Sequence, residues 1–437
     1  MNQKLSLWEI FPIGLMLFSL FFGAGNLIFP PALGQAAGTN LLPAILGFLL
    51  TGVGLPLLGI LAIARIGNAN SNALANKVHP RFSLVLMTII NLTIGPLFAI
   101  PRTGAVAFDV GIRPFLTPDG YTIGLFIYTA LFFGCTYFLA LNPNKLVDRV
   151  GKILTPLLLL SLAVLIMQIF FEPLGAIGAP LGSYETRPFF KGFQEGYLTM
   201  DLLASVVFGV VVINSIKTKG ISDAATLTKL CILSGLVAAF FLAVIYMSLA
   251  YMGATSVTLL GYAENGGLVL SGVAKHYFGA FGNLALGLTI TFACLTTSIG
   301  LVSSCATFFA DIFHRQILYE RLVLYFTLFS FGVSNIGLTK LISFSIPFLV
   351  GIYPIVMVLI ILSFFDGLFQ SRKEVYQGAI ALTTIMSILE GLKAAGFSCS
   401  SITVWCLTYI PLYNFDFGWI VPALVGALGG YLYSKFS

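Results

Sequence analysis

The sequence predicts an all-helical protein that crosses a membrane about 12 times, and two observations lead to this fold class. Of the 437 residues, 58% are hydrophobic and only 9% are charged. A soluble protein of this composition would have too few polar side chains to cover its surface. The apolar residues also form continuous runs of about 20, the length of a membrane-spanning helix, and do not alternate with polar residues as in a transmembrane β-barrel.

Twelve apolar runs follow one another along the chain. We expect them to form a single transmembrane domain over residues 1–437, with one helix for each run. The first run is expected to be retained, because the start MNQKLSLWEIFPIG lacks the small-residue cleavage site of a signal peptide. The predicted spans are 11–33, 41–64, 82–107, 121–141, 151–172, 193–215, 230–253, 282–309, 322–338, 342–365, 376–393 and 415–435.

The basic residues predict the orientation of the chain. Most of the 22 Lys and Arg residues fall in the termini and in the loops 65–81, 145–152, 217–229, 315–321 and 372–373. Twelve spans place these segments on one side of the membrane, and the positive-inside rule identifies that side as the cytoplasm. Both termini are then cytoplasmic. The net charge of +6 reflects this orientation, and we expect no nucleic-acid partner.

The first apolar run contains a stretch that is a poor helix core. Residues 18–34 read FSLFFGAGNLIFPPALG, with Gly25 directly before Asn26. In the bilayer core, a broken helix is tolerated only against protein or a water-filled cavity. A break exposes a positive helix start, which suits a carboxylate, and a negative helix end, which suits a cation. Because many transporters bind substrate and ion at such breaks, we predict a ligand site at Ala24 and Gly25.

The sixth run contains a second candidate for a break. In LTMDLLASVVFGVVVINSI, Asp201 lies well within the apolar run and is followed by Ser205 and the pair Phe208-Gly209. A carboxylate inside a membrane costs roughly 3 kcal/mol on insertion scales and indicates a functional site. Five spans separate the two breaks, as in two inverted five-helix repeats. We expect these repeats at 11–172 and 193–365, followed by two additional helices at 376–437.

Several of these stretches also carry a resemblance. GAGNLIFPPALGQAAG, EGYLTMDLLASVVFGVVVINSI and ACLTTSIGL, together with GPLFAIPRTGAVAFDVG and KTKGISD, are similar to the bacterial branched-chain amino acid:cation symporters of the BrnQ type. The likeness covers essentially the whole chain. It implies the LeuT fold, with ten core helices in two inverted repeats and two helices added. It also implies uptake of leucine, isoleucine and valine across the bacterial plasma (inner) membrane, driven by a cation gradient.

The resemblance further implies a Na⁺ site between the first and eighth runs. The stretch ACLTTSI is similar to the sodium-binding run of neurotransmitter:sodium symporters, in which a carbonyl and two consecutive hydroxyls face the first helix. The ligands carried over by position are the carbonyls of Ser19, Phe22 and Ala293 and the hydroxyls of Thr296 and Thr297. Five oxygens without a carboxylate suit a monovalent hard cation. The alternative is that these hydroxyls bond to their own helix or to a neighbouring one.

Other polar residues are open to more than one role. Asn26 matches an amide that helps to bind a second sodium ion in those symporters, or it braces the unwound loop. Asp201 attracts the substrate ammonium, binds a cation, takes up a proton, or caps a helix near the outer interface. Arg102, Asp109 and Arg113 are expected near the outer end of the third span, as vestibule or interface charges.

The sequence therefore predicts a secondary transporter that works by alternating access. The expected substrate site comprises Ala24, Gly25, Asp201, Ser205, Phe208 and Gly209. Na⁺ is the expected coupling ion, and a proton carried by Asp201 is the alternative. The chain has no GxxxxGK[ST] pattern for ATP and no Ser/His/Asp or metal-ligand set for an enzyme, which leaves an ion channel as the other class. We expect no covalent cofactor and no obligatory protein partner. The expected contacts are with the substrate and with membrane lipid.

Overall fold

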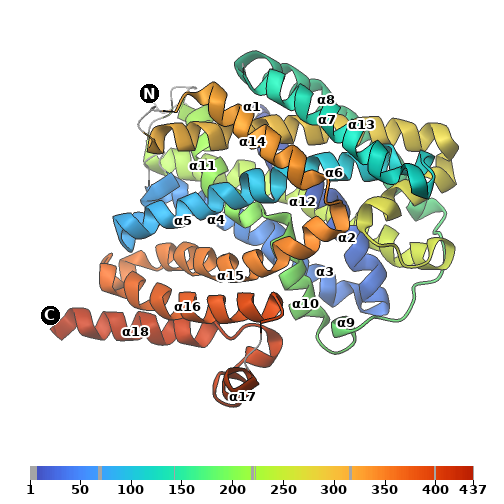
Figure 1. Ribbon diagram of the computed structural model, residues 1–437. Coiled ribbons are helices and arrows are strands. Elements are labelled where there is room, and N and C mark those ends of the chain that lie inside the picture. The colour runs from blue at the N-terminus through green and yellow to red at the C-terminus, as the bar shows by residue number, and fades with distance from the viewer. Residues whose placement is uncertain are drawn as a thin grey trace.

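The computed structural model of the chain describes residues 7–66, 71–141, 143–217, 221, 223–313, 317–397 and 400–436. Within these residues every regular element is a helix, which confirms the all-helical class (Figure 1). Seven helical stretches of the described chain are long and apolar enough to cross a membrane, or eight if the bent pair Pro188–Thr199 and Asp201–Lys217 is one span. Residues 1–6, 218–220 and 314–316, which contribute to the predicted orientation, lie outside the described residues.

The helices follow the apolar runs of the sequence. In chain order they are α1 (Leu7–Phe21), α2 (Ala24–Ala37), α3 (Leu41–Leu49), α4 (Leu55–Ile66), α5 (Pro80–Leu92), α6 (Ala99–Gly111), α7 (Tyr121–Ala140), α8 (Pro143–Phe171), α9 (Ser183–Thr186), α10 (Pro188–Glu195), α11 (Asp201–Lys217), α12 (Ala224–Leu260), α13 (Gly266–Ile312), α14 (Tyr319–Ser334), α15 (Leu338–Phe364), α16 (Lys373–Ala394), α17 (Ser400–Tyr409) and α18 (Ile420–Phe436).

Each predicted run overlaps at least one of these helices, but several runs are divided. The second run forms α3 and α4 around a π-helical turn at Leu50–Gly54, and the third forms α5 and α6 around another at Thr93–Leu97. Pro96 lies in the second of these turns, where a missing N–H and the proline ring disrupt the regular ladder. The number of membrane crossings, predicted as 12, stays a prediction.

The first run is interrupted between α1 and α2. Phe22 and Gly23 are not helical, and the backbone at Gly23 is extended, with φ −114° and ψ −164°. The side chain of Asn26 turns back so that its Oδ1 accepts the Gly23 N–H at 3.1 Å. This bond, from the N-cap amide to the side chain of the third helical residue, is one of the two bonds of a capping box. It marks the start of α2, separated by only two residues from the end of α1.

The sixth run is bent at Met200, directly before Asp201. A short 3₁₀ helix, Gly196–Thr199, ends at Met200, whose φ of 66° places it in the left-handed region that non-glycine residues seldom adopt. The helix α11 then runs without interruption from Asp201 through Phe208 and Gly209. The interruption expected in the sixth run thus lies beside Asp201, and the residue that bends is a methionine and not a glycine.

The two interrupted segments are packed in a crossed arrangement. The segments α1 and α2 pack against α12, whereas α10 and α11 pack against α3 and α4. Glycine allows the close approach in both cases. A Cβ on Gly34 of α2 would lie 1.9 Å from the carbonyl oxygen of Ala250, and a Cβ on Gly192 of α10 would lie 1.9 Å from that of Ala44. Small residues at such contacts are typical of helix packing in membranes.

The C-terminal helices lie along one side of the bundle, where α16 packs between α15 and α18 (Figure 1). Asp416, which precedes α18, connects this layer to the rest of the chain. Its carboxylate pairs with Arg187 at 3.2 Å and with Lys393 of α16 at 3.0 Å. The two cavities described below are lined mainly by residues of α1, α2, α6, α11 and α13, with Leu158 of α8 beside the smaller one.

Candidate functional site

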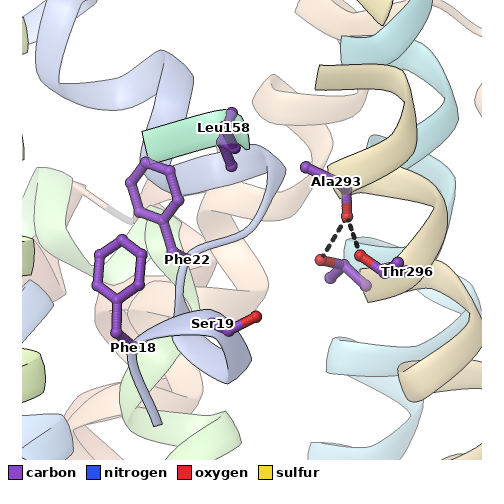
Figure 2. A pocket seen from close by; sticks show the side chains of 7 residues that line it. Phe18, Ser19, Phe22, Leu158, Ala293 and Thr296 are labelled. Atoms are coloured by element: carbon purple, nitrogen blue, oxygen red, sulfur yellow. Dashed lines mark hydrogen bonds between the residues drawn. The ribbon is translucent and has the colours of Figure 1, made fainter. Parts of the chain in front are cut away.

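The five residues predicted to bind the cation line one small cavity of about 10 Å³, close to the space of a single water molecule. Ser19 and Phe22 come from the end of α1 and from the break that follows it, whereas Ala293, Thr296 and Thr297 lie on α13. Figure 2 shows the two sets on opposite sides of this cavity, with Leu158 of α8 at its edge. The tertiary structure therefore brings the predicted ligand set together.

Both threonine hydroxyls at this cavity bond to their own helix. Thr296 Oγ1 donates to the carbonyl oxygen of Ala293 at 2.8 Å, and Thr297 Oγ1 donates to the same oxygen at 3.0 Å (Figure 2). Such back-bonding is common for threonine in membrane helices. It uses the hydroxyl hydrogens and leaves the oxygen lone pairs as acceptors. The cavity thus presents hydroxyl and carbonyl oxygens, which are the ligands of a hard monovalent cation.

A larger cavity of about 50 Å³ lies where the two interrupted segments meet. Four of the predicted substrate residues line it, namely Ala24, Gly25, Asp201 and Phe208, and so does Asn26. Ser205 and Gly209 do not. The complete lining is Leu20, Phe21, Gly23, Ala24, Gly25, Asn26, Ile94, Ala99, Arg102, Thr103, Thr199, Met200, Asp201, Ala204, Phe208, Thr297 and Leu301. The predicted substrate site is therefore brought together in part.

Ser205 and Gly209 face the neighbouring helix α4. The hydroxyl of Ser205 donates to the carbonyl oxygen of Leu202 at 2.6 Å, and a Cβ on Gly59 of α4 would lie 2.0 Å from this hydroxyl. A Cβ on Gly209 would lie 3.3 Å from the side chain of Ile63. Successive helical residues are rotated by about 100°, so one face of α11 lines the cavity and the adjacent face packs on α4.

Asn26 connects the two interrupted segments. Its Nδ2 donates to Asp201 Oδ2 at 2.6 Å and also contacts the hydroxyl of Tyr246 on α12. The Tyr246 hydroxyl in turn donates to Asp201 Oδ2 at 3.4 Å. These contacts are those of a brace between α2, α11 and α12. Asn26 lines the larger cavity and is not among the residues around the smaller one.

Two residues of this site were missed in the sequence. Arg102 was expected near the outer end of the third span, but it lies in α6, is only 3% exposed, and lines the larger cavity. Its position inside the apolar run 82–107 was the available signal, since charged residues within a span usually face a cavity or a partner. Tyr246 carries no such signal, because tyrosine is ordinary in an apolar helix. Asp109 is also buried, and it pairs with Arg113 at 3.3 Å.

A bundle of apolar helices, with cavities that carry a few polar groups where two helices are interrupted, is the architecture of a secondary transporter. Comparison with protein families is consistent with this class. Residues 6–437 match the model of the family described as branched-chain amino acid transport protein, and the chain belongs to that family. This confirms the resemblance seen in the sequence. Because this family consists of transporters, the chain is a multi-pass membrane transporter and not an enzyme.

Curated relatives match over almost their whole length. The chain is 50% identical over 436 residues to the branched-chain amino acid permease BraB of Bacillus subtilis, covering 100% of this chain and 98% of the relative. It is 43% identical to the branched-chain amino acid transport system 2 carrier protein of Pseudomonas aeruginosa, covering 96% and 94%. It is 37% identical to the branched-chain amino acid permease BrnQ of Escherichia coli, covering 97% and 95%.

Among solved structures, the chain is similar to Mhp1, a nucleobase-cation-symport-1 family transporter in a closed conformation with bromovinylhydantoin bound. The TM-score is 0.63 at 13% sequence identity, and the match covers 98% of this chain and 92% of that one. The inward-facing conformation of Mhp1 matches with a TM-score of 0.60 at 15% identity. These likenesses show the fold alone, and they agree with the LeuT-like class expected from the sequence.

Proposed function

We propose that the protein imports leucine, isoleucine and valine by cation-coupled symport, with Na⁺ as the coupling ion, through alternating access. The observation that carries this proposal is that Thr297 lines both cavities. A cation held in the smaller cavity and an amino acid held in the larger one would share this residue and the break at Phe22 and Gly23. A Cβ on Gly23 would lie 3.3 Å from Thr297 Cγ2, so the break packs directly on α13.

The larger cavity supplies complementary groups for an aliphatic amino acid. The first amides of α2, at Ala24 and Gly25, lack partners within their helix and carry the positive end of its dipole, which suits the substrate carboxylate. Asp201 offers a negative charge to the ammonium group. Phe208 and Leu301 provide apolar surface for a branched side chain. One methylene in such a pocket is worth about 1–3 kcal/mol, so preference for larger side chains is moderate.

The smaller cavity supports the choice of Na⁺. Its polar groups are the oxygens of Ser19, Ala293, Thr296 and Thr297, without a carboxylate. A bound Na⁺ would connect α1 to α13 and would favour one position of these two helices relative to each other. Entry of one positive charge down a potential of 100 mV supplies about 2.3 kcal/mol, which corresponds to roughly fiftyfold accumulation before any Na⁺ gradient. The alternative coupling ion is a proton. Asp201 is the candidate proton carrier, because it is buried and contacts Asn26 and Tyr246.

The crossed packing supports two inverted repeats at 11–172 and 193–365, with 376–437 added. In such a pair of repeats, the first segment of each repeat packs against the second span of the other. The contacts of α2 with α12, and of α10 with α3, have this reciprocal form. We accordingly propose 12 crossings, with both termini in the cytoplasm and the protein in the bacterial inner membrane.

Uptake of radiolabelled leucine into proteoliposomes tests this function. Gradients of Na⁺ and of pH are imposed separately at a fixed membrane potential, with empty liposomes as the control. We expect a Na⁺ gradient to drive accumulation, and isoleucine and valine to compete. Accumulation driven by a pH gradient alone would favour the proton carrier. Ion current that does not require an amino acid would indicate a channel and contradict the proposal.

A further inference from the structure

Arg102 is a buried charge that forms no ion pair with the described residues. The ion pairs of the described residues involve Lys77, Arg113, Arg187, Lys191 and Lys393, and Arg102 is in none of them. A buried guanidinium is costly unless an anion compensates it. Arg102 and Asp201 line the same cavity, and yet the two side chains do not form an ion pair. The two opposite charges act on each other across the cavity without forming an ion pair.

The contacts of Arg102 leave most of its donors available. Among the described residues, its guanidinium makes one hydrogen bond, from Nη1 to the carbonyl oxygen of Leu198 at 2.6 Å. It also lies over the ring of Phe29, 5.2 Å from the centroid, and this contact holds its plane without using a donor. A guanidinium has five N–H donors in a planar fork that matches a carboxylate.

The guanidinium also lies next to the first turn of α2. A Cβ on Gly25 would be 3.5 Å from Arg102 Nη1, so little separates the two. The start of a helix carries partial positive charge from its unpaired amides. A cation beside a helix start is unfavourable unless an anion lies between them or close by. Both features attract the same kind of ligand, which is a carboxylate.

We propose that Arg102 binds the substrate carboxylate together with the amides of α2, while Asp201 binds the ammonium group. This inference rests on the proposed function and makes it more specific. The site is a clamp for a zwitterion, in which each charged end of the amino acid neutralises one charge of the protein. Aliphatic acids without the ammonium group, and amines or amides without the carboxylate, leave one buried charge uncompensated and are rejected.

The competing explanation is that Arg102 only braces the bend at Met200 through its bond to Leu198. The two roles differ in what they predict for ligand analogues. A brace shapes the whole cavity, so its loss weakens all ligands by a similar factor. A carboxylate contact affects only ligands that have a carboxylate. Binding of leucine, leucinamide and 4-methylpentanoate to the full-length protein in detergent, by competition against radiolabelled leucine, measures this difference.

We expect the wild-type protein to bind both analogues at least about 100-fold more weakly than leucine. In Arg102→Gln, leucine should bind at least about 30-fold more weakly, while leucinamide changes by less than about threefold. The matched control is Arg372→Gln, since Arg372 likewise donates to a backbone carbonyl, that of Ser434, and lies over an aromatic ring, that of Tyr431. This control should leave both affinities unchanged.

An unchanged affinity for leucine in Arg102→Gln, or an equal loss for leucine and leucinamide, would overturn the clamp. If Arg102→Gln is not recovered as a folded protein, Arg102→Lys replaces it, because lysine keeps the charge without the planar fork. The preference for leucine over leucinamide should then fall about tenfold, and an unchanged preference overturns the proposal. Wild-type protein that binds none of the three branched-chain amino acids would instead reject the proposed function itself.

Discussion

Asn26 Nδ2 donates a hydrogen bond of 2.6 Å to Asp201 Oδ2, and this bond connects the start of α2 to the start of α11 across 175 positions of the chain. Asn26 is the third residue of its helix and Asp201 is the first of its own. A carboxylate at a helix start is favoured by the helix dipole, and the amide places a donor on it. The two helix starts therefore belong to one polar site, with Tyr246 as a third member.

Replacing Asn26 by alanine should weaken this connection. The change removes the donor to Asp201 and the acceptor for the Gly23 N–H, which leaves two buried polar groups without these bonds. Each costs about 1–3 kcal/mol. We expect a lower melting temperature and at least tenfold weaker leucine binding. The matched control is Asn91→Ala, since among the described residues the buried Asn91 side chain donates within its own helix, to Met87. Equal effects of the two substitutions would contradict the bridging role.

The double substitution of Thr296 and Thr297 by valine should abolish the sodium dependence of leucine uptake. Valine keeps the shape of threonine and removes the hydroxyl oxygens from the smaller cavity. Uptake assays at varied Na⁺, with expression verified, provide the measurement. Thr289→Val is the control, because the Thr289 hydroxyl bonds to Ala285 on the same helix and lies outside both cavities. Normal activation by Na⁺ in the double variant would refute the site.

Gly25 and Gly34 both lie in α2, and substitutions at the two positions should have different effects: loss of leucine binding at Gly25 and loss of stability at Gly34. At Gly25, an added Cβ meets the ring of Phe29 at 3.2 Å and Arg102 at 3.5 Å, both of them side chains that can shift. Gly25→Val should therefore fold and lose leucine binding, because β-branched bulk enters the cavity. At Gly34 a Cβ would meet the backbone of α12 at 1.9 Å. Gly34→Ala should destabilise the protein by about 1–3 kcal/mol or more.

Size-exclusion profiles and scintillation proximity binding with labelled leucine separate these two outcomes. The expected result is a monodisperse Gly25→Val protein without binding, and a Gly34→Ala protein that aggregates or melts earlier. Near-normal affinity in a monodisperse Gly25→Val protein would mean that the start of α2 is not the substrate site.

Asp201→Asn distinguishes the coupling roles of this residue. Asparagine is similar in size and removes the charge and the site of protonation. If Asp201 only attracts the ammonium group, leucine should bind at least tenfold more weakly, and Na⁺ should still drive transport. If Asp201 carries a proton, a pH gradient should no longer drive accumulation, while exchange of leucine persists. Unchanged affinity and unchanged coupling would remove Asp201 from the site.

An ion pair outside the membrane-spanning helices predicts a pH dependence of stability. Asp366, which follows α15, pairs with Lys77 at 2.6 Å. Partial burial alone would raise the pKa of Asp366, but hydrogen bonds from Lys77, Ser371 and Tyr376 bring it below its ordinary value. Because the folded pKa is lower than the unfolded one, the contribution to stability is present above the unfolded pKa of about 3.9 and is lost as pH falls.

Asp366→Asn should therefore lower the free energy of unfolding by at most about 1 kcal/mol at neutral pH, since the pair is partly exposed. The difference from wild type should disappear as the pH falls through the folded pKa of Asp366. Melting temperatures at a series of pH values provide the measurement, with exposed Asp119→Asn as the control. A difference that is independent of pH would show that the carboxylate charge is not responsible.

The sequence by itself determined the class of protein and the location of the first break. Continuous apolar runs have one physical interpretation, because hydrocarbon tolerates only backbone whose hydrogen bonds are satisfied internally. Gly23 and Asn26 marked the break, since the signals for ending and restarting a helix are local. The pair Thr296 and Thr297 marked one wall of the smaller cavity for the same reason, as adjacent residues on one helix stay together in any packing.

The tertiary structure alone decided which distant residues share a cavity. The bend at Met200 carries no local signal, because a left-handed methionine is held by its surroundings and not by its own preference. Whether Ser205 or Phe208 of α11 faces the cavity depends on the rotation of that helix against α4. Arg102 and Tyr246 join the site only because α6 and α12 pack beside the two helix starts. Such contacts depend on the packing of whole helices, and no short stretch of sequence contains that information.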